Sequence, residues 1–172
     1  FFNPVRYMHL LEIIPGPKTL PNVLDSMSHF VRRILGKGVV NAKDTTNFIA
    51  NRIGVHGMMT TIHSMEELNY TVEEVDAIVG RPMGRPKSAA FGTADIVGLD
   101  TFLHVAKNCY DSLADDPERD VFKSPESITK MVEMGLKGRK AGGGFYKKEG
   151  RDLFAIDTKT LEYRPKVKPD FP

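Results

Sequence analysis

The sequence predicts a mainly α fold with a short α/β segment at its N-terminus. Residues 1–44 follow a strand, helix and strand pattern, whereas apolar residues recur at helical spacing over most of residues 45–136. The chain has 172 residues, of which 41% are hydrophobic, and this is enough for one domain with a buried core and an appendage. A fold of packed helices with a small α/β part is therefore expected.

The first element is a strand with a carboxylate in its middle. A loop that turns at Asn3-Pro4 leads into a predicted strand over residues 10–14, in which Glu12 stands among apolar residues. The chain begins inside this pattern and without an initiator methionine, so we expect it to be a fragment.

A helix and a second strand complete the N-terminal segment. Apolar spacing predicts a helix from about residue 20 to residue 35, with Thr19 as its N-cap. A β-branched run predicts a strand over residues 38–42. Two strands do not form a stable sheet alone, so this segment is expected to need a packing partner.

The helical part starts with a long element. Its apolar pattern runs from about residue 47 to residue 67. Thr71 and Glu74 have the spacing of a capping box, which predicts a helix over residues 72–79. Two prolines and two glycines predict a loop over residues 80–86.

Two further helices are expected after this loop. The first covers about residues 93–113, and Gly98 divides it. The second starts with Ser124 as the N-cap and Pro125 at the first helical position, and it extends to about residue 136.

The C-terminal part reads differently from the helices. Gly142-Gly143-Gly144 predicts a flexible hinge, after which Phe145 and Tyr146 dock on the helices. The polar segment that follows is expected to be a short hairpin or an extended linker.

Composition excludes several classes of protein. A net charge of +2, with 24 basic and 22 acidic residues spread along the chain, gives no bias toward nucleic acid. The apolar runs are too short to span a bilayer, so no membrane insertion is expected. The single cysteine, Cys109, cannot form an intramolecular disulfide and fits a reducing compartment, which favours the cytoplasm.

Few residues point to chemistry by themselves. Glu12 would be costly to bury unless a cation or histidine paired with it, although an exposed strand-edge glutamate is the alternative. Asn51 stands inside a helix that asparagine does not favour. His56 and His63 share a helix face without further ligands, so no metal site is expected. The triple glycine follows a helix and lacks the Gly-x-Gly-x-x-Gly spacing of a dinucleotide loop.

Four ordered segments resemble the 3-hydroxyacyl-CoA dehydrogenases of fatty-acid β-oxidation. The first is Phe1-Phe2-Asn3-Pro4, where the family has His-Phe-Phe-Asn-Pro with a catalytic histidine, and a strand glutamate a fixed distance behind it. The others are residues 43–52, residues 82–84 with residues 95–100, and residues 138–146. The resemblance covers about residues 1–148.

The resemblance implies roles for four residues. Glu12 would orient the catalytic histidine, Asn51 would bind the substrate, and Asn3 and Lys140 would lie on the cofactor side. Without the resemblance, Asn3 is explained by its turn and Lys140 by a solvated surface. The chain departs from the family pattern at Thr46-Asn47, where Pro-Gly is usual, and at Ala141, where threonine is usual.

The resemblance also implies a fold and a function. An all-helical C-terminal dehydrogenase domain over residues 45–148 would follow a remnant of a Rossmann-type α/β domain in residues 1–44, with an extended tail or linker in residues 149–172. The whole enzyme would oxidise a 3-hydroxyacyl-CoA with NAD and form a homodimer or contact other modules of its chain. The fragment alone is expected to be inactive, and a stand-alone helical interaction module is the alternative.

Overall fold

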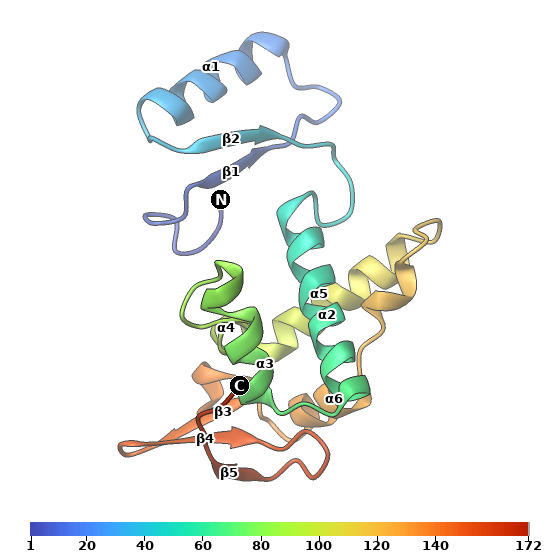
Figure 1. Cartoon of the computed structure of the whole chain (residues 1–172). Coiled ribbons are helices and arrows are strands. Elements are labelled where there is room, and N and C mark those ends of the chain that lie inside the picture. The colour runs from blue at the N-terminus through green and yellow to red at the C-terminus, as the bar shows by residue number, and fades with distance from the viewer. Residues whose placement is uncertain (172) are drawn as a thin grey trace. The chain divides into compact units, whose positions relative to one another are not determined.

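The computed structural model describes residues 1–171, and the chain divides into two compact units (Figure 1). Unit 1 is Phe1–Arg52 and unit 2 starts at Ile53. Each unit is described here by itself. None of the helices in residues 1–171 combines the length and the apolar character that a membrane-spanning helix needs.

Unit 1 contains a parallel βαβ unit. Strands β1 (Leu10–Ile13) and β2 (Gly38–Asn41) are paired in parallel, with Leu10 opposite Gly38 and Ile13 opposite Asn41. Helix α1 (Pro21–Arg33) connects them and packs on both strands (Figure 1). The predicted strand, helix and strand are confirmed.

The start of α1 differs from the prediction. Its N-cap is Leu20, which makes no side-chain cap bond, and Pro21 takes the first helical position. Thr19 is not the cap, because its hydroxyl accepts a hydrogen bond of 3.0 Å from the amide of Gly16. Proline cannot donate a backbone hydrogen bond, so the helix can begin there without a side-chain acceptor.

Unit 1 buries little apolar surface. Among its described residues, the buried hydrophobic side chains are Leu11, Val31 and Ala42. The apolar stripe that the sequence predicts on α1 is present but exposed. It consists of Leu20, Val23, Met27, Phe30 and Ile34. Such a stripe has the pattern of a helix face that packs against other protein.

Unit 2 is built mainly from helices. Helix α2 (Ala50–Leu68) starts in unit 1 and continues into unit 2. Helix α3 (Val72–Val79) has the predicted capping box, because the Thr71 hydroxyl accepts from the amide of Glu74 and the Glu74 carboxylate accepts from the amide of Thr71. The other helical elements are η1 (Arg81–Met83), α4 (Phe91–Val97), α5 (Leu99–Ser112), η2 (Arg119–Phe122), α6 (Glu126–Glu133) and η3 (Arg139–Ala141).

Two helix boundaries follow local signals in the sequence. Gly98 has a φ of 99° and separates α4 from α5, as predicted. Pro125, rather than Ser124, is the N-cap of α6. The core of unit 2 lies between the helices, and its fully buried members include Met59, Ile62, Met65, Phe91, Leu99, Phe122, Ile128, Met131 and Phe145.

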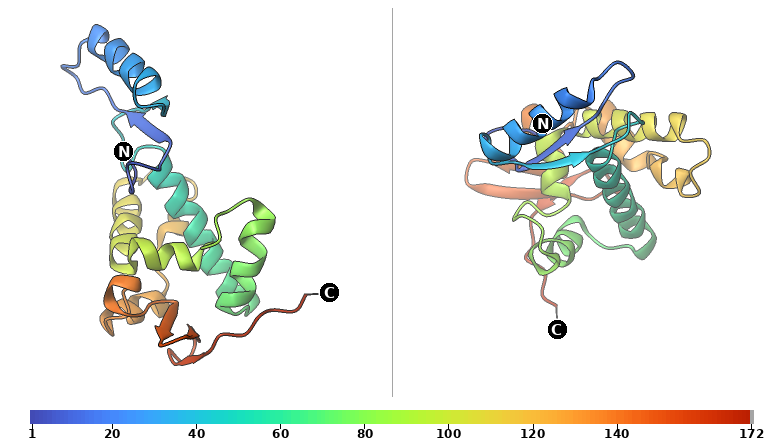
Figure 2. Two further views of the ribbon diagram at one scale, coloured as in Figure 1. Left: turned by 90° about the vertical axis from the view of Figure 1, so that its left-hand side faces the viewer. Right: turned by 90° about the horizontal axis from the view of Figure 1, so that it is seen from above.

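A three-stranded antiparallel sheet completes unit 2. Strands β3 (Tyr146–Glu149), β4 (Asp152–Ile156) and β5 (Tyr163–Pro165) lie in this order (Figure 2). After β5, the chain runs on to residue 171 as an extended segment (Figure 2). A two-bond ion pair fixes β5 to α3, with Arg164 Nη1 and Nη2 at 2.7 and 2.9 Å from the oxygens of Glu73.

The predicted fold class, a mainly α protein with only a remnant of an α/β domain, is wrong. The N-terminal residues form a complete βαβ unit with its own parallel sheet, and the C-terminal residues add an antiparallel sheet. The short hairpin that the sequence predicts as one alternative is present in β3 and β4, but the third strand, β5, was not predicted, and its Arg164 contacts Glu73 far away in sequence. The chain is a mixed helix and sheet structure.

Candidate functional site

Glu12 on β1 contacts the start of α2. Its Oε1 accepts hydrogen bonds from the amides of Ala50 at 2.7 Å and Ile49 at 3.2 Å. Ala50 is the first residue of α2, so these donors belong to a helix N-terminus, where a carboxylate is favoured. Glu12 is half-buried, unlike the exposed strand-edge glutamate of the alternative interpretation.

The chain reaches α2 through an unusual turn. Asn47 and Phe48 have φ angles of 58° and 52°, in the left-handed region. The helix consequently begins at Ala50 and not at residue 47 as predicted. Asparagine tolerates this conformation, which is consistent with Thr46-Asn47 standing where the family has Pro-Gly.

Asn51 lies beside the Glu12 contact. It follows Ala50 directly, is exposed, and stands in the first turn of α2 rather than in its interior. Asparagine is better tolerated near a helix start than in the middle of a helix, so this position explains the residue that looked misplaced in the sequence. The fold thus brings Glu12 and Asn51 to one place.

Asn3 belongs to a loop that a lysine holds. The Asn3–Pro4 peptide bond is cis, and Asn3 is exposed. The Lys37 ammonium donates to the carbonyls of Val5 at 2.7 Å and Met8 at 2.6 Å. Lys37 was not singled out in the sequence, where its only signal is its place between two glycines before β2. The structure describes no hydrogen bond between Asn3 and Glu12 within residues 1–171.

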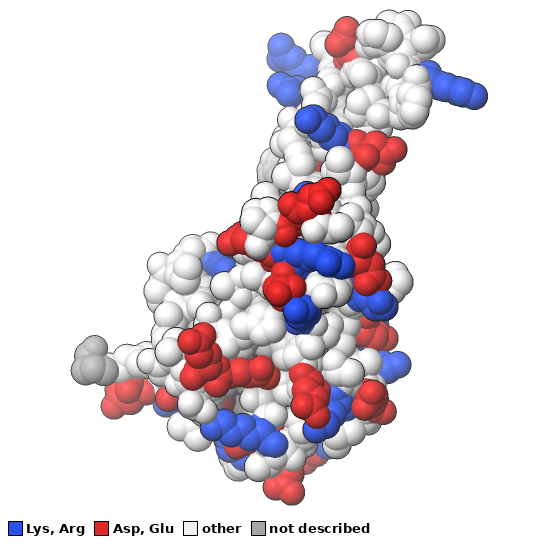
Figure 3. Space-filling view, turned by 90° about the vertical axis from the view of Figure 1, so that its right-hand side faces the viewer, with Lys and Arg blue, Asp and Glu red and all other residues white. Residues whose placement is uncertain are grey.

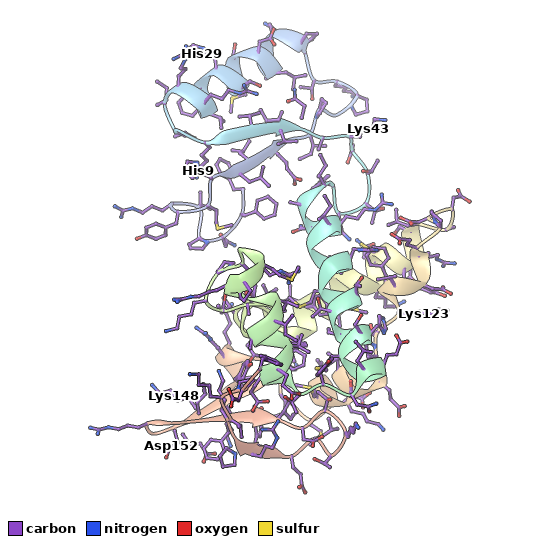
Figure 4. The ribbon with its side chains drawn as sticks, in the orientation of Figure 1. His9, His29, Lys43, Lys123, Lys148 and Asp152 are labelled. Atoms are coloured by element: carbon purple, nitrogen blue, oxygen red, sulfur yellow. The ribbon has the colours of Figure 1, made fainter. Side chains whose placement is uncertain are left out.

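Lys140 lies in unit 2, on the exposed side of η3. Figure 4 shows the side chains of both units, with Lys43 labelled in the segment that leads to α2. The glycines on either side of Lys140 pack tightly. A Cβ on Gly138 would lie 2.5 Å from the Asp95 carbonyl, and a Cβ on Gly144 would collide with the Asp95 carboxylate.

Asp95 is the polar centre of this packing. Its Oδ1 and Oδ2 each accept a hydrogen bond of 2.8 Å, from the amides of Phe145 and Tyr146 respectively. The Asp95 residue is only 2% exposed. Its burial raises the pKa of the carboxyl to about 6, although the two amides oppose the shift. Residues 95–100 resemble the family pattern, but no signal in the sequence indicates this role of Asp95.

A second carboxylate and a phenol adjoin Asp95. Asp76 accepts from the amides of Ala90 and Phe91 at 3.0 and 2.8 Å, at the start of α4. The Tyr146 hydroxyl donates to Asp76 Oδ2 at 2.9 Å. Burial raises the pKa of Asp76, and burial together with the neighbouring carboxylates also raises the pKa of Tyr146.

The predicted docking of the aromatic pair is confirmed. Phe145 is fully buried and packs on Phe91, with 4.4 Å between ring centroids. Gly143 and Gly144 are buried between these contacts, so the segment read as a flexible hinge is a close-packed turn.

The remaining candidates have structural surroundings. His56 Nε2 lies 3.1 Å from Glu118 Oε2, and His63 Nε2 lies 3.1 Å from the Val121 carbonyl. Cys109 is fully buried in the core. Figure 3 shows acidic and basic side chains interspersed on one face of the protein.

Two family models match the chain. Residues 48–148 match the C-terminal domain of 3-hydroxyacyl-CoA dehydrogenase, and residues 1–45 match its NAD binding domain. The second match assigns the βαβ unit to a nucleotide-binding α/β domain, in agreement with the corrected fold class.

Two curated relatives match nearly the whole chain. A probable 3-hydroxyacyl-CoA dehydrogenase of Bacillus subtilis is 54% identical over 168 residues, which are 98% of this chain and 21% of that protein. A protein of Rickettsia prowazekii, named as a putative trifunctional enzyme of the fatty acid oxidation complex, is 33% identical over an alignment of 176 residues that covers 99% of this chain and 24% of that protein. The chain therefore spans about a quarter or less of these relatives.

A solved structure has the same fold. The crystal structure of (S)-3-hydroxybutyryl-CoA dehydrogenase from Ralstonia eutropha matches with a TM-score of 0.74 and 29% identity. The match covers 87% of this chain and 51% of that chain.

Proposed function

Because the chain belongs to the 3-hydroxyacyl-CoA dehydrogenase family, we propose that it is part of an enzyme that oxidises a 3-hydroxyacyl-CoA to a 3-oxoacyl-CoA with NAD. The observation that carries this proposal is the contact of Glu12 with the first amide of α2. In support of it, Glu12, the proposed orienting acid, accepts from the amide of the residue directly before Asn51, the proposed substrate residue. A carboxylate also stabilises a helix start in a protein without catalytic function, so family membership is what favours the enzyme over a helical scaffold.

Glu12 is proposed to act on a histidine. In the family pattern the catalytic histidine stands immediately before Phe1-Phe2, and the strand glutamate accepts its ring N–H. A carboxylate can accept several hydrogen bonds, so Glu12 can bond the α2 amides and a histidine together. The negative charge would fix the histidine tautomer and raise its basicity, which suits removal of the proton from the substrate 3-hydroxyl.

Asn51 is proposed to bind the substrate near its reacting carbonyl. Asn51 is exposed in the first turn of α2, and it directly follows Ala50, whose amide donates to the carboxylate that would orient the base. An amide N–H donor in this place can stabilise negative charge that develops on the oxygen at C3.

Asn3 and Lys140 are the residues proposed to hold NAD. Both side chains are exposed, and an amide and an ammonium are suitable donors to the ribose and phosphate oxygens of a dinucleotide. NAD, when bound, accepts the hydride from C3 of the substrate. Each of the two residues is proposed as a cofactor contact of its own unit, and the 172 residues contain no Gly-x-Gly-x-x-Gly loop. We therefore propose that the 172 residues do not catalyse the reaction alone.

The test uses the full-length parent enzyme with Glu12→Gln. Glutamine keeps an oxygen for the α2 amides but loses the charge, so we expect kcat to fall about 100-fold, within the usual range for removing support of a general base. The acidic limb of the pH profile should shift to lower pH at the same time, because the histidine loses the charge that raises its basicity. Asn51→Ala should mainly raise KM for the acyl-CoA.

Glu67→Gln serves as the matched control, because Glu67 is an exposed acid farther along α2. It removes the same charge and should leave kcat unchanged. A Glu12→Gln enzyme with kcat within twofold of the unmodified enzyme would contradict the proposed role.

We further propose a cytoplasmic protein that forms a homodimer or contacts other modules of its parent chain. The single cysteine supports the first part. Exposed apolar side chains of unit 2, namely Ile96, Val97 and Met134, support the second. Sedimentation equilibrium of the parent enzyme measures its oligomeric state.

A further inference from the structure

Unit 2 contains a hollow whose lining is rich in basic side chains. Two adjoining cavities of about 750 and about 670 Å³ have Asp76, Lys87, Leu153 and Lys166 in common. Together they form one depression between the loop before α4 and the sheet of β3, β4 and β5, which we call the basic hollow. Its residues all belong to unit 2.

The cations of the basic hollow come from separate parts of the chain. They are Lys87 before α4, Arg139 in η3, Lys148 in β3, Arg151 in the following turn, and Lys166 and Lys168 after β5. All of them are exposed, and no ion pair described for residues 1–171 includes any of them. Figure 4 labels Lys148 and Asp152 at one end of the β3–β4 hairpin.

Most acids of the basic hollow are already engaged by donors of the protein. Glu73 holds both guanidinium nitrogens of Arg164. Asp76 accepts from backbone amides at the start of α4 and from the hydroxyl of Tyr146, and Asp95 accepts from two amides of the chain. Arg139 also lies near enough to Asp95 to lower its pKa, against the effect of burial.

Asp152 is the one exposed acid in the lining of the basic hollow. The other carboxylates, those of Glu73, Asp76 and Asp95, accept hydrogen bonds from donors of the protein. The lysine ammonium groups of the basic hollow have no acidic partner among the ion pairs described for residues 1–171. Cations that converge on a concave surface raise the local potential and attract anions.

We propose that the basic hollow binds a compact anion that carries two or more phosphate groups. Phosphate oxygens accept charge-assisted hydrogen bonds from ammonium and guanidinium groups, and the cations come from several separate segments of the lining, so two or more phosphate groups offer acceptors to more of them than one does. A volume of about 750 Å³ suits a small molecule rather than a macromolecule. Tyr146 also belongs to the lining of the basic hollow, and Lys166 Nζ lies 4.7 Å from the centroid of its ring.

The source of the phosphates is either inorganic pyrophosphate or the diphosphate of a nucleotide. The experiment titrates the 172-residue chain with pyrophosphate, phosphate and adenosine 5′-diphosphate by calorimetry at low and moderate salt. We expect saturable binding of pyrophosphate, at least 10-fold tighter than phosphate and weakened by salt. Diphosphate nucleotide that binds tighter than pyrophosphate indicates the nucleotide source, and equal affinity indicates that only phosphates are recognised.

Charge-matched double variants test the location of this site. Lys87→Gln with Lys166→Gln removes two cations of the basic hollow and should weaken pyrophosphate binding at least 10-fold. Lys107→Gln with Lys130→Gln removes two exposed cations elsewhere in unit 2, and it should change the affinity less than twofold. Circular dichroism checks that both variants are folded. Equal weakening by the two variants, or no saturable binding of pyrophosphate, would overturn the proposal.

Discussion

Asp95 shows how one buried carboxylate can organise a segment. Its two oxygens bond two successive amides, so it fixes the direction in which the chain enters β3. Burial makes the charged form costly, and the two hydrogen bonds offset only part of that cost. The protonation of Asp95 depends on pH, and the stability of the glycine-rich turn that it holds should therefore depend on pH as well.

The stability of the protein should reflect this linkage. Burial raises the pKa of Asp95 from 3.8 to about 6, so the folded protein binds the proton more tightly than the unfolded chain does. The contribution of Asp95 to the unfolding free energy should rise as pH falls from about 7 to about 4, by at most about 3 kcal/mol. Urea unfolding of the protein and of Asp95→Asn at several pH values measures this contribution. A stability difference between the two that does not change with pH would refute the linkage.

Other residues of the candidate site could be recognised only partly from the sequence. The resemblance singled out Glu12, but its contact partners lie almost forty residues later, and no local signal predicts that pairing. Lys37 was missed for the same reason, because its acceptors are backbone carbonyls of a distant loop. Side chains that bond across long sequence separations become visible only in the structure.

Among the elements, the segment around η3, residues 138–144, packs closely against Asp95. Gly138 has a φ of 107°, and a Cβ there would lie 2.5 Å from the Asp95 carbonyl. Gly142 has a φ of 85° but no atom within 4 Å of such a Cβ. A substitution at Gly142 therefore tests backbone strain alone, whereas a substitution at Gly138 tests backbone strain together with steric collision.

Alanine substitutions should show this separation. Gly142→Ala adds only backbone strain and should cost about 1 kcal/mol of unfolding free energy. Gly138→Ala adds the collision with the Asp95 backbone and should cost about 3 kcal/mol or more. Thermal unfolding followed by circular dichroism compares them. Equal losses of stability would mean that the turn can shift away from Asp95.

The elements that the sequence predicted well are those with local determinants. The capping box of Thr71 and Glu74 marks α3, and the positive φ of Gly98 separates α4 from α5. The sheet of β3, β4 and β5 has no such marker. Its strands are held by contacts such as Arg164 with Glu73, which are 91 residues apart. The fold class therefore could not be predicted from the periodicity of apolar residues, because that periodicity does not indicate contacts between residues far apart in sequence.

At the scale of the whole molecule, apolar burial is uneven. Unit 2 has a large core, whereas unit 1 buries few side chains and exposes the apolar stripe of α1. Burial of apolar surface is the main source of stability, so the two units should differ in local stability.

Hydrogen exchange of the purified 172-residue chain should reveal this difference. Amides of α1 and β2 should exchange much faster than those of α2 and α5 in unit 2, since opening unit 1 exposes little additional apolar surface. Equal protection of both units would contradict this expectation.

The same preparation should show no formation of NADH from a 3-hydroxyacyl-CoA. Measurable turnover would contradict the proposal that the 172 residues do not catalyse the reaction alone.

The bond between Glu12 and Ala50 also limits how members of the family can be recombined. Glu12 lies in the segment that matches the NAD binding domain, and Ala50 lies in the segment that matches the C-terminal domain. A chimera joined anywhere between residues 13 and 49 takes the carboxylate from one parent and the helix start from the other. The natural border between the two segments, around residues 46–47, is therefore a risky crossover point unless both parents present the same turn before α2.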